Sequence, residues 1–184
     1  MPDQHSTVVG GSTAQRVRNC PASVGLAAKL PPKPAGPAAI RGTALHTVME
    51  RHFEEDTDLS AFEGITFDTK DGPYTVTADD VGQCRLAVKA LDKLLAQTGA
   101  VNFDLEVRVE YGGDIPQAFG TVDFLGWNGK WIILADWKFG YNPVTAENNE
   151  QLLFYAGALR RTRPELFNGK RKIMLAIIQP AKED

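Results

Sequence analysis

The stretch GTVDFLGWNGKWIILADWKFG, residues 120–140, holds two apolar runs separated by the turn signal Asn-Gly at positions 128–129. Apolar, β-branched and aromatic residues favour strands, and Asn-Gly between two such runs is typical of a tight β-hairpin. Charged residues lie at the strand ends farthest from the turn: Asp123 in the first strand, Asp136 and Lys138 in the second. Pairing across the hairpin should therefore bring Asp123 and Asp136 close together.

Side chains alternate between the two faces of a strand, which predicts further neighbours for this acidic pair. Asp136 and Lys138 should share one face of their strand, with Trp137 on the other. The run VNFDLEVRVEY at 101–111 alternates strictly and predicts the preceding strand. Its polar face carries Glu106, which could join the two aspartates.

The assignment of Glu106 leaves alternatives open, because two other acids belong to the same polar face. Asp104 and Glu110 lie two and four positions away from it in the sequence. Both compete with Glu106 for this assignment.

Helices are predicted before and after the three strands. PPKPAGPAA at 31–39 is rich in proline and glycine, which predicts a loop. A helix should follow with Thr43 as its N-cap, and Thr77 with Asp80 forms a capping-box pattern before the next one. The complete prediction is a helical stretch over 12–30 broken at Pro21, helices at 41–56, 78–97 and 146–161, strands at 101–111, 118–127, 131–138 and 171–180, and irregular chain between 56 and 76.

The end of the chain completes an α/β pattern. Thr145 is the expected cap of the helix at 146–161, which leads to RKIMLAIIQP at 171–180. This last strand is almost entirely apolar, as is typical of a strand in the interior of a sheet. Helices and strands in this order predict an α/β layer rather than a bundle or a barrel.

Composition and charge restrict the class of protein. The chain has 184 residues, 43% of them apolar, and a formal net charge of −3, which predicts a folded domain and argues against a basic coat protein that covers DNA without regard to sequence. Cys20 and Cys84 lie far apart and are expected to be reduced thiols. The sequence shows no apolar run of about 20 residues and no signal-peptide pattern, so a cytoplasmic protein with no membrane contact is expected.

The predicted acidic cluster has a specific chemical use. Carboxylates brought together repel each other, and a divalent cation between them makes the arrangement favourable. Oxygen ligands suit Mg²⁺ or Mn²⁺, and a lysine beside the ion can stabilise negative charge or orient a water molecule. Asp123, Asp136 and Lys138 therefore predict metal-assisted hydrolysis of a phosphodiester bond.

Gly-Thr-Val-Asp at 120–123 followed by Asp-Trp-Lys at 136–138 resembles the PD-(D/E)XK nuclease superfamily. Three other segments are similar to its RecB-like exonuclease branch, which includes phage members. They are RGTALHTVME at 41–50, NNEQLLFYAGAL at 148–159 and NCPAS at 19–23.

The resemblance implies a fold and a set of roles. The fold would be a restriction-endonuclease-like αβββαβ core with a mixed sheet flanked by helices, formed by residues 12–184 as one domain after a flexible leader at 1–11. The implied metal ligands are Asp123, Asp136, the backbone carbonyl of Trp137, His46 and, for a second ion, Glu106. Lys138 would position or activate the water, and Gln151 and Tyr155 would steady the site or contact DNA.

The implied function is a metal-dependent DNA nuclease, an exonuclease of phage or prophage recombination type that uses a two-metal mechanism with Mg²⁺ or Mn²⁺. Its partners would be DNA and either a recombination protein or further copies of the chain. Two cysteines are too few for the branch's four-cysteine iron–sulfur cluster, and no phosphate-binding Gly-Lys-Ser/Thr loop indicates ATP use. The alternatives are a catalytically inactive nuclease fold that binds DNA or serves in assembly, and a phosphohydrolase acting on small phosphate esters.

A basic cluster near the end of the chain has two open interpretations. It could follow the phosphates of DNA, or it could be an ordinary solvated turn. Its members are Arg160, Arg161, Arg163, Lys170, Arg171 and Lys172.

Overall fold

The computed structural model describes residues 6, 8–31 and 34–180. The chain divides into two compact units, which are described separately. Unit 1 comprises Met1–Pro32, Thr98–Asp136 and Thr145–Ala176, and unit 2 comprises Lys33–Gln97, Trp137–Val144 and Ile177–Asp184. The single domain expected over 12–184 stays a prediction.

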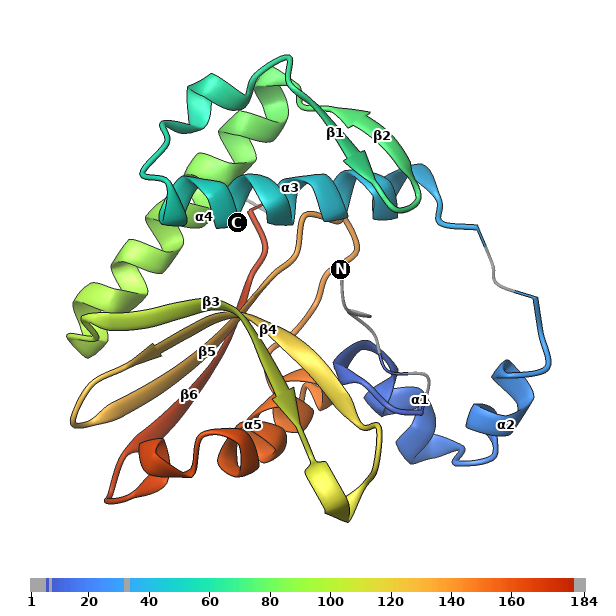
Figure 1. Ribbon diagram of the computed structural model, residues 1–184. Helices are drawn as coiled ribbons and strands as arrows, with labels where there is room; N and C mark the ends of the chain where they lie inside the picture. The colour runs from blue at the N-terminus through green and yellow to red at the C-terminus, as the bar shows by residue number, and fades with distance from the viewer. Residues whose placement is uncertain (1–5, 7, 32–33, 181–184) are drawn as a thin grey trace. The chain divides into compact units, whose positions relative to one another are not determined.

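Among the described residues, the main sheet has four strands in the order β3-β4-β5-β6 (Figure 1). The first three strands, β3 (Asn102–Glu110), β4 (Phe119–Trp127) and β5 (Trp131–Trp137), are antiparallel neighbours. β6 (Lys172–Ile178) runs parallel to β5, because its two ends bond to Lys130 and Lys138 in that order. The expected α/β class with a mixed sheet is therefore confirmed.

The position expected for the last strand was wrong. β6 is the final strand in the sheet order rather than an interior one, and Ile173 on it is 44% exposed. An apolar run predicts that a strand forms, whereas its place in the sheet depends on which partner it meets.

The β4–β5 hairpin has a longer turn than its Asn-Gly sequence predicts. Trp127 pairs with Ile132, and the side-chain oxygen of Asn128 accepts hydrogen bonds from the backbone of Lys130 (2.7 Å) and Trp131 (2.8 Å). Asparagine favours such turns because its side chain can bond to the backbone two residues ahead. The register continues to the pair Phe124 and Ala135.

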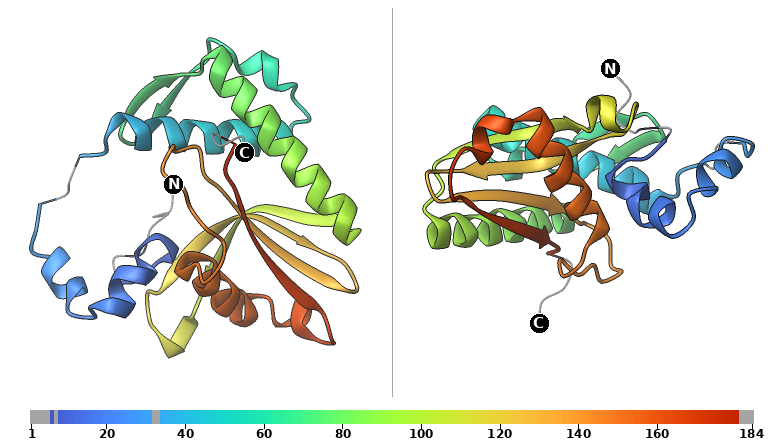
Figure 2. Two further views of the ribbon diagram at one scale, coloured as in Figure 1. Left: turned by 180° about the vertical axis from the view of Figure 1, so that it is seen from behind. Right: turned by 90° about the horizontal axis from the view of Figure 1, so that it is seen from below.

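Helix α5 (Glu150–Thr162) packs on this sheet within unit 1 (Figures 1 and 2). It begins later than predicted, because the side chain of Asn149, and not that of Thr145, caps it by accepting from the backbone of Gln151 and Leu152. Buried apolar residues form the core between α5 and the sheet. They include Val109, Val122, Leu125, Leu134, Ala158 and Leu159.

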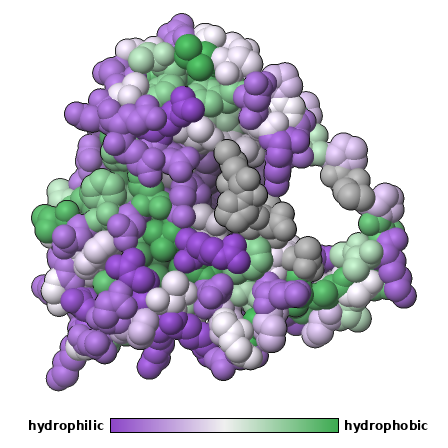
Figure 3. Space-filling view, viewed as in Figure 1, coloured by the Kyte–Doolittle hydropathy of each residue, from purple (hydrophilic) through white to green (hydrophobic). Residues whose placement is uncertain are grey.

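The N-terminal part of unit 1 contains α1 (Ala14–Asn19) and α2 (Ser23–Ala27), separated at Pro21 as predicted. The expected flexible leader at 1–11 is corrected at its end, because Val9, Gly10 and Gly11 are buried. Its residues 1–5 and 7 lie outside the described residues. Apolar side chains of the α1–α2 segment lie at the surface (Figure 3). Leu26 on α2 and Leu30 just after it are 60% and 70% exposed.

Unit 2 is built on α3 (Pro37–Glu54) and α4 (Ala78–Thr98). α3 begins with Pro37 after the N-cap Gly36, so 37–39, expected to be loop, is helical and Thr43 lies inside the helix rather than at its cap. Proline suits the first turn because its missing N–H has no helical partner there. The hairpin of β1 (Thr66–Thr69) and β2 (Gly72–Thr75), which the sequence did not predict, packs on α3.

The capping box expected before α4 is confirmed. The backbone N–H of Thr77 donates to Asp80 Oδ2 at 2.9 Å, and the N–H of Asp80 donates to Thr77 Oγ1 at 3.2 Å. From α4 onward the elements follow in the predicted order of helix, three strands, helix and strand. Short 3₁₀ turns complete the structure at Gly11–Thr13, Leu59–Phe62, Gly112–Asp114 and Pro164–Phe167.

Within the part of the chain that the structure describes, no helix combines the length and the apolar character needed to cross a membrane.

Candidate metal centre

Two acidic side chains meet at the centre of the β3–β4 pair in unit 1. Glu106 lies between Leu105 and Val107, whose partners Phe124 and Val122 flank Asp123 on the neighbouring strand. The register thus places Glu106 level with Asp123, and a carboxylate oxygen of each lies within 4.8 Å of the other. Asp123 is only 6% exposed.

Glu106 has an unusual backbone conformation for a strand residue. Its φ is +47°, in the left-handed region that non-glycine residues rarely adopt. Such a conformation costs about 1–3 kcal/mol and persists only where the surrounding structure holds it, often at functional sites. The strain coincides with the position at which Glu106 meets Asp123.

The pattern of core residues changes face at the same level of the sheet. Val107 packs against the α5 core, whereas Phe103 stacks on Phe124, which does not belong to that core. On β4, Val122 and Leu125 both belong to this core and lie on either side of Asp123 in the sequence. They are three positions apart, whereas residues on one face of a regular strand are an even number of positions apart. The sequence prediction of one unbroken alternating face along 101–111 is therefore corrected at Glu106.

The acids that competed with Glu106 are occupied elsewhere in unit 1. Asp104 accepts a hydrogen bond from Arg163 Nη1 at 3.0 Å. Glu110 is an exposed residue whose carboxylate lies 3.9 Å from Arg108. Of these three acids on β3, Glu106 is the one whose carboxylate lies within 4.8 Å of that of Asp123.

Asp136 supplies a third carboxylate from β5. One further step of the β4–β5 register beyond Phe124 and Ala135 brings it level with Asp123. It is 2% exposed, and its Oδ1 accepts a hydrogen bond of 2.7 Å from Gln151 Nε2. The cap of α5 fixes this donor, because Asn149 binds the backbone N–H of Gln151 at 3.0 Å.

Tyr155 lies one helical turn after Gln151 and faces the same acids. Gln151 Nε2 also donates to the Tyr155 hydroxyl at 3.0 Å. Burial raises the pKa of Tyr155 above its usual value, and the negative charges of Asp136, Asp123 and Glu106 raise it further against the lowering effect of Gln151. Tyr155 therefore stays a neutral phenol, and all three carboxylates are near enough to act on it electrostatically.

Two glycines make room for the ring of Tyr155. A Cβ atom on Gly120 would lie 2.8 Å from its Cε1, and one on Gly11 would lie 2.4 Å from the same atom. Distances below 3 Å would force the ring or the backbone to move. Sequence reasoning missed Gly11, which it had placed in the leader, and no local signal in the sequence reveals a contact over so long a separation.

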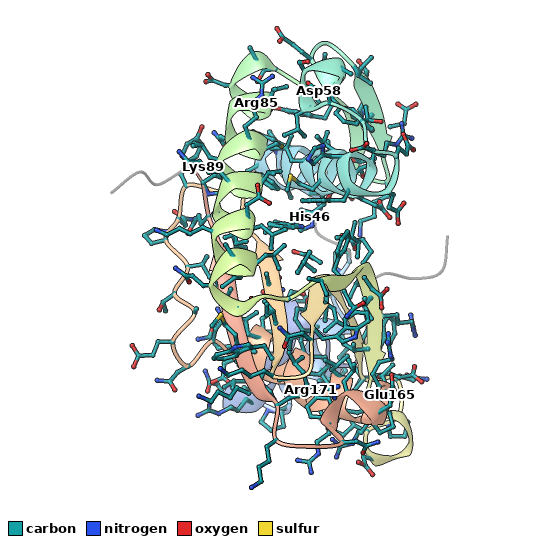
Figure 4. The ribbon with its side chains drawn as sticks, turned by 90° about the vertical axis from the view of Figure 1, so that its left-hand side faces the viewer. His46, Asp58, Arg85, Lys89, Glu165 and Arg171 are labelled. Atoms are coloured by element: carbon teal, nitrogen blue, oxygen red, sulfur yellow. The ribbon has the colours of Figure 1, made fainter. Side chains whose placement is uncertain are left out.

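The other predicted site residues belong to unit 2. His46, labelled in Figure 4, lies on α3, and its ring meets that of Phe139 edge-on with centroids 6.0 Å apart. Trp137 is 2% exposed and stacks on Phe53. The backbone N–H of Lys138 donates to Ile178 at 2.9 Å, and its side chain is half-buried.

Arg41 is a further residue of unit 2 that the sequence did not single out. Its guanidinium donates to Asp80 (2.7 Å), to Gln83 (2.8 Å) and to the carbonyl oxygen of Phe139 (2.6 Å). Burial raises the pKa of Asp80, but hydrogen bonds from Thr77 and the charge of Arg41 outweigh it and lower the pKa overall. This network anchors the segment that follows Lys138 to α3.

Several members of the basic cluster bind groups of the protein itself. Arg163 pairs with Asp104, Arg161 Nε donates to Asp114 at 2.5 Å, and Arg171, labelled in Figure 4, donates to the carbonyl of Asn128 at 2.7 Å. These contacts favour the solvated-turn interpretation for the three arginines.

The carboxylates of Glu106 and Asp123 fit a divalent cation chemically. Two oxygens bound to one octahedral ion at about 2.1 Å lie about 3–4 Å apart. The approach of Glu106 to Asp123 within 4.8 Å needs only a small shift to reach that spacing. Hard oxygen ligands in a buried acidic site suit Mg²⁺ or Mn²⁺ better than softer metals.

The comparison with protein families places the chain. The family described as "Protein of unknown function (DUF2800)" matches residues 5–184, so the chain belongs to that family. A comparison with curated proteins found no match. The family description names no activity.

Proposed function

We propose that this protein is a metal-dependent DNA nuclease with a restriction-endonuclease-like core, of the RecB-like exonuclease type used in phage recombination. The observation that supports it most strongly is the approach of Glu106 to Asp123 within 4.8 Å, with Asp136 level with Asp123 on the neighbouring strand. A protein that only needed a stable core would gain nothing from three acids placed together, since like charges repel.

The residues of unit 1 would form the acidic side of the metal centre. Asp123 and Asp136 would supply the first ligands, and Glu106 would supply a ligand for a second ion. The 2.7 Å hydrogen bond from Gln151 to Oδ1 holds the Asp136 carboxylate in one orientation, which also fixes the position of its Oδ2. A bound Mg²⁺ or Mn²⁺ would supply positive charge to the phosphate and lower the pKa of a bound water.

The roles of three residues in unit 2 rest on the resemblance to the nuclease superfamily. His46 and the carbonyl of Trp137 would complete the ligand set, and Lys138 would orient the attacking water. A lysine suits this role because it places a compact positive charge on a flexible stem. The partner would be DNA, and the cofactor would be Mg²⁺ or Mn²⁺.

The first experiment measures degradation of linear DNA by the purified protein with MnCl₂, with MgCl₂ and with EDTA. We expect metal-dependent degradation that both Asp136→Ala and Lys138→Ala abolish. Asp114→Asn is the matched control, because Asp114 is an exposed acid paired with Arg161. Full activity in both site variants would exclude this mechanism.

Calorimetric titration with MnCl₂ distinguishes residues that bind the metal from the lysine that would orient the water. Asp136→Ala should lose manganese binding, because a ligand is gone, whereas Lys138→Ala should bind manganese but not cleave DNA. His46→Ala should bind manganese more weakly if the histidine is a ligand, by about 10-fold or more.

A wild-type protein that binds no manganese but still binds DNA would instead indicate the inactive DNA-binding module. Hydrolysis of small phosphate esters without degradation of DNA would indicate the phosphohydrolase.

A further inference from the structure

The segment that follows Lys138 is held rigidly by one side chain of unit 2. The amide nitrogen of Gln179 donates to the carbonyls of Gly140 (2.6 Å) and Asn142 (2.7 Å). The amide oxygen of Gln179 accepts from the backbone of Val144 at 2.9 Å. Three hydrogen bonds to one side chain therefore restrain the backbone of residues 140–144.

The beginning of the same segment is anchored independently. Arg41 Nη1 donates to the carbonyl of Phe139 at 2.6 Å, and Arg41 is itself paired with the buried carboxylate of Asp80. The ring of Phe139 is 3% exposed and contacts His46. Both ends of the segment are therefore attached to the body of unit 2.

Tyr141 projects from this fixed backbone into solvent. Of the Phe, Tyr and Trp side chains in the described part of the chain, it is the most exposed at 74%, and Phe103 follows at 45%. An aromatic ring on a rigid backbone loses little conformational entropy when it binds a flat partner.

We propose that Tyr141 is a stacking platform for a nucleobase of the substrate strand, close to the phosphate that is cleaved. The inference rests on the proposed nuclease function. Every nucleobase has a π-face, so stacking on an aromatic ring holds a strand without selecting its sequence.

The reach of Tyr141 agrees with this role. It follows Lys138 by three residues, so their Cα atoms are at most about 11 Å apart. Successive nucleotides of one DNA strand are spaced by about 3.4 Å along the helix axis. Tyr141 can therefore contact a base within about three nucleotides of the phosphate that Lys138 faces.

The test measures binding of a fluorescein-labelled single-stranded oligodeoxynucleotide by fluorescence anisotropy in EDTA, where no metal-dependent cleavage occurs. Tyr141→Ala should weaken binding by about 5- to 150-fold, the range measured for removing one base–aromatic stack. Tyr141→Phe keeps the ring and should bind as the wild type does. Because Tyr141 is exposed, neither substitution should lower the melting temperature.

A second probe locates the contact. The same oligonucleotide with one abasic position, moved along the strand, should bind wild-type protein and Tyr141→Ala equally when the missing base is the one that stacks.

Equal affinity of wild type and Tyr141→Ala for the intact strand would overturn the inference, as would a Tyr141→Phe variant that binds as weakly as Tyr141→Ala. If those results came with metal-dependent DNA degradation by the wild type, the nuclease proposal would stand. A wild type that neither binds nor degrades DNA would overturn both.

Discussion

The acidic centre should make the metal-free protein less stable than one of its own variants. Asp123→Asn keeps the shape of the side chain and removes a buried charge that lies within 4.8 Å of Glu106. Two unit charges at that distance repel by about 3 kcal/mol at an effective dielectric constant of about 20. Glu106 is only half-buried, so water reduces the repulsion, and we expect a stabilisation of about 1–3 kcal/mol in EDTA.

The same substitution should have the opposite effect in the presence of metal. At a manganese concentration 100 times the dissociation constant, binding to the native state adds about 2.7 kcal/mol to the stability of the wild type. Asp123→Asn should lose most of that gain, because a ligand has become a neutral amide. The order of stability of the two proteins should therefore reverse when manganese replaces EDTA.

Thermal melting in the two buffers measures this reversal. For a chain of this size, each kcal/mol corresponds to about 2–4 °C in Tm, so the variant should melt about 2–12 °C above the wild type in EDTA. Asp114→Asn, which changes an exposed acid in unit 1, should show no reversal. A variant that melts below the wild type in both buffers would show that Asp123 serves the fold and not a metal.

Three further predictions concern packing and buried groups. Gly120→Ala should cost about 1–3 kcal/mol by displacing the tyrosine ring beside it, whereas Gly113→Ala, whose added Cβ would meet nothing within 4 Å, should be nearly neutral in urea unfolding. Arg41→Met should cost about 3–5 kcal/mol, because it leaves a buried carboxylate without its ion pair; a loss below 1 kcal/mol would contradict the network. Cys20 should react with a thiol reagent in the native protein, and Cys84 only after unfolding. Burial raises the pKa of Cys84 from 9.0 to about 12, so its contribution to stability is complete below pH 9 and falls as the pH rises from 9 to 12, a fall that Cys84→Ala should reduce.

The parts of the fold that depend on neighbouring residues were predictable. The capping box of Thr77 and Asp80 acts over three residues, and it forms as the sequence indicates. The start of α5 was misplaced, because Thr145 and Asn149 can both cap a helix and packing on the sheet selects between them. The hairpin of β1 and β2 was missed, because its short strands are stabilised by contact with α3 rather than by a strong pattern of their own.

The candidate site also has one part that local sequence rules predicted and another that they could not predict. Period-two alternation limited the acid on β3 to Asp104, Glu106 or Glu110, and it could not choose among them. The choice of Glu106 depends on its left-handed backbone, which breaks the alternation that the prediction assumed. The hydrogen bond from Gln151 to Asp136 requires α5 to lie on the sheet, which no local rule specifies.

The sequence by itself determined the order of helices and strands from α4 onward and the presence of carboxylates in the two apolar strands at 120–138, because hydrophobic periodicity and turn chemistry act within a few residues. Only the tertiary structure decided that β6 lies at the end of the sheet order, that Glu106 is the acid beside Asp123, and that Gly11 makes room for Tyr155. These features arise from contacts between residues far apart in the chain, and their energies depend on packing geometry that residue types alone do not contain.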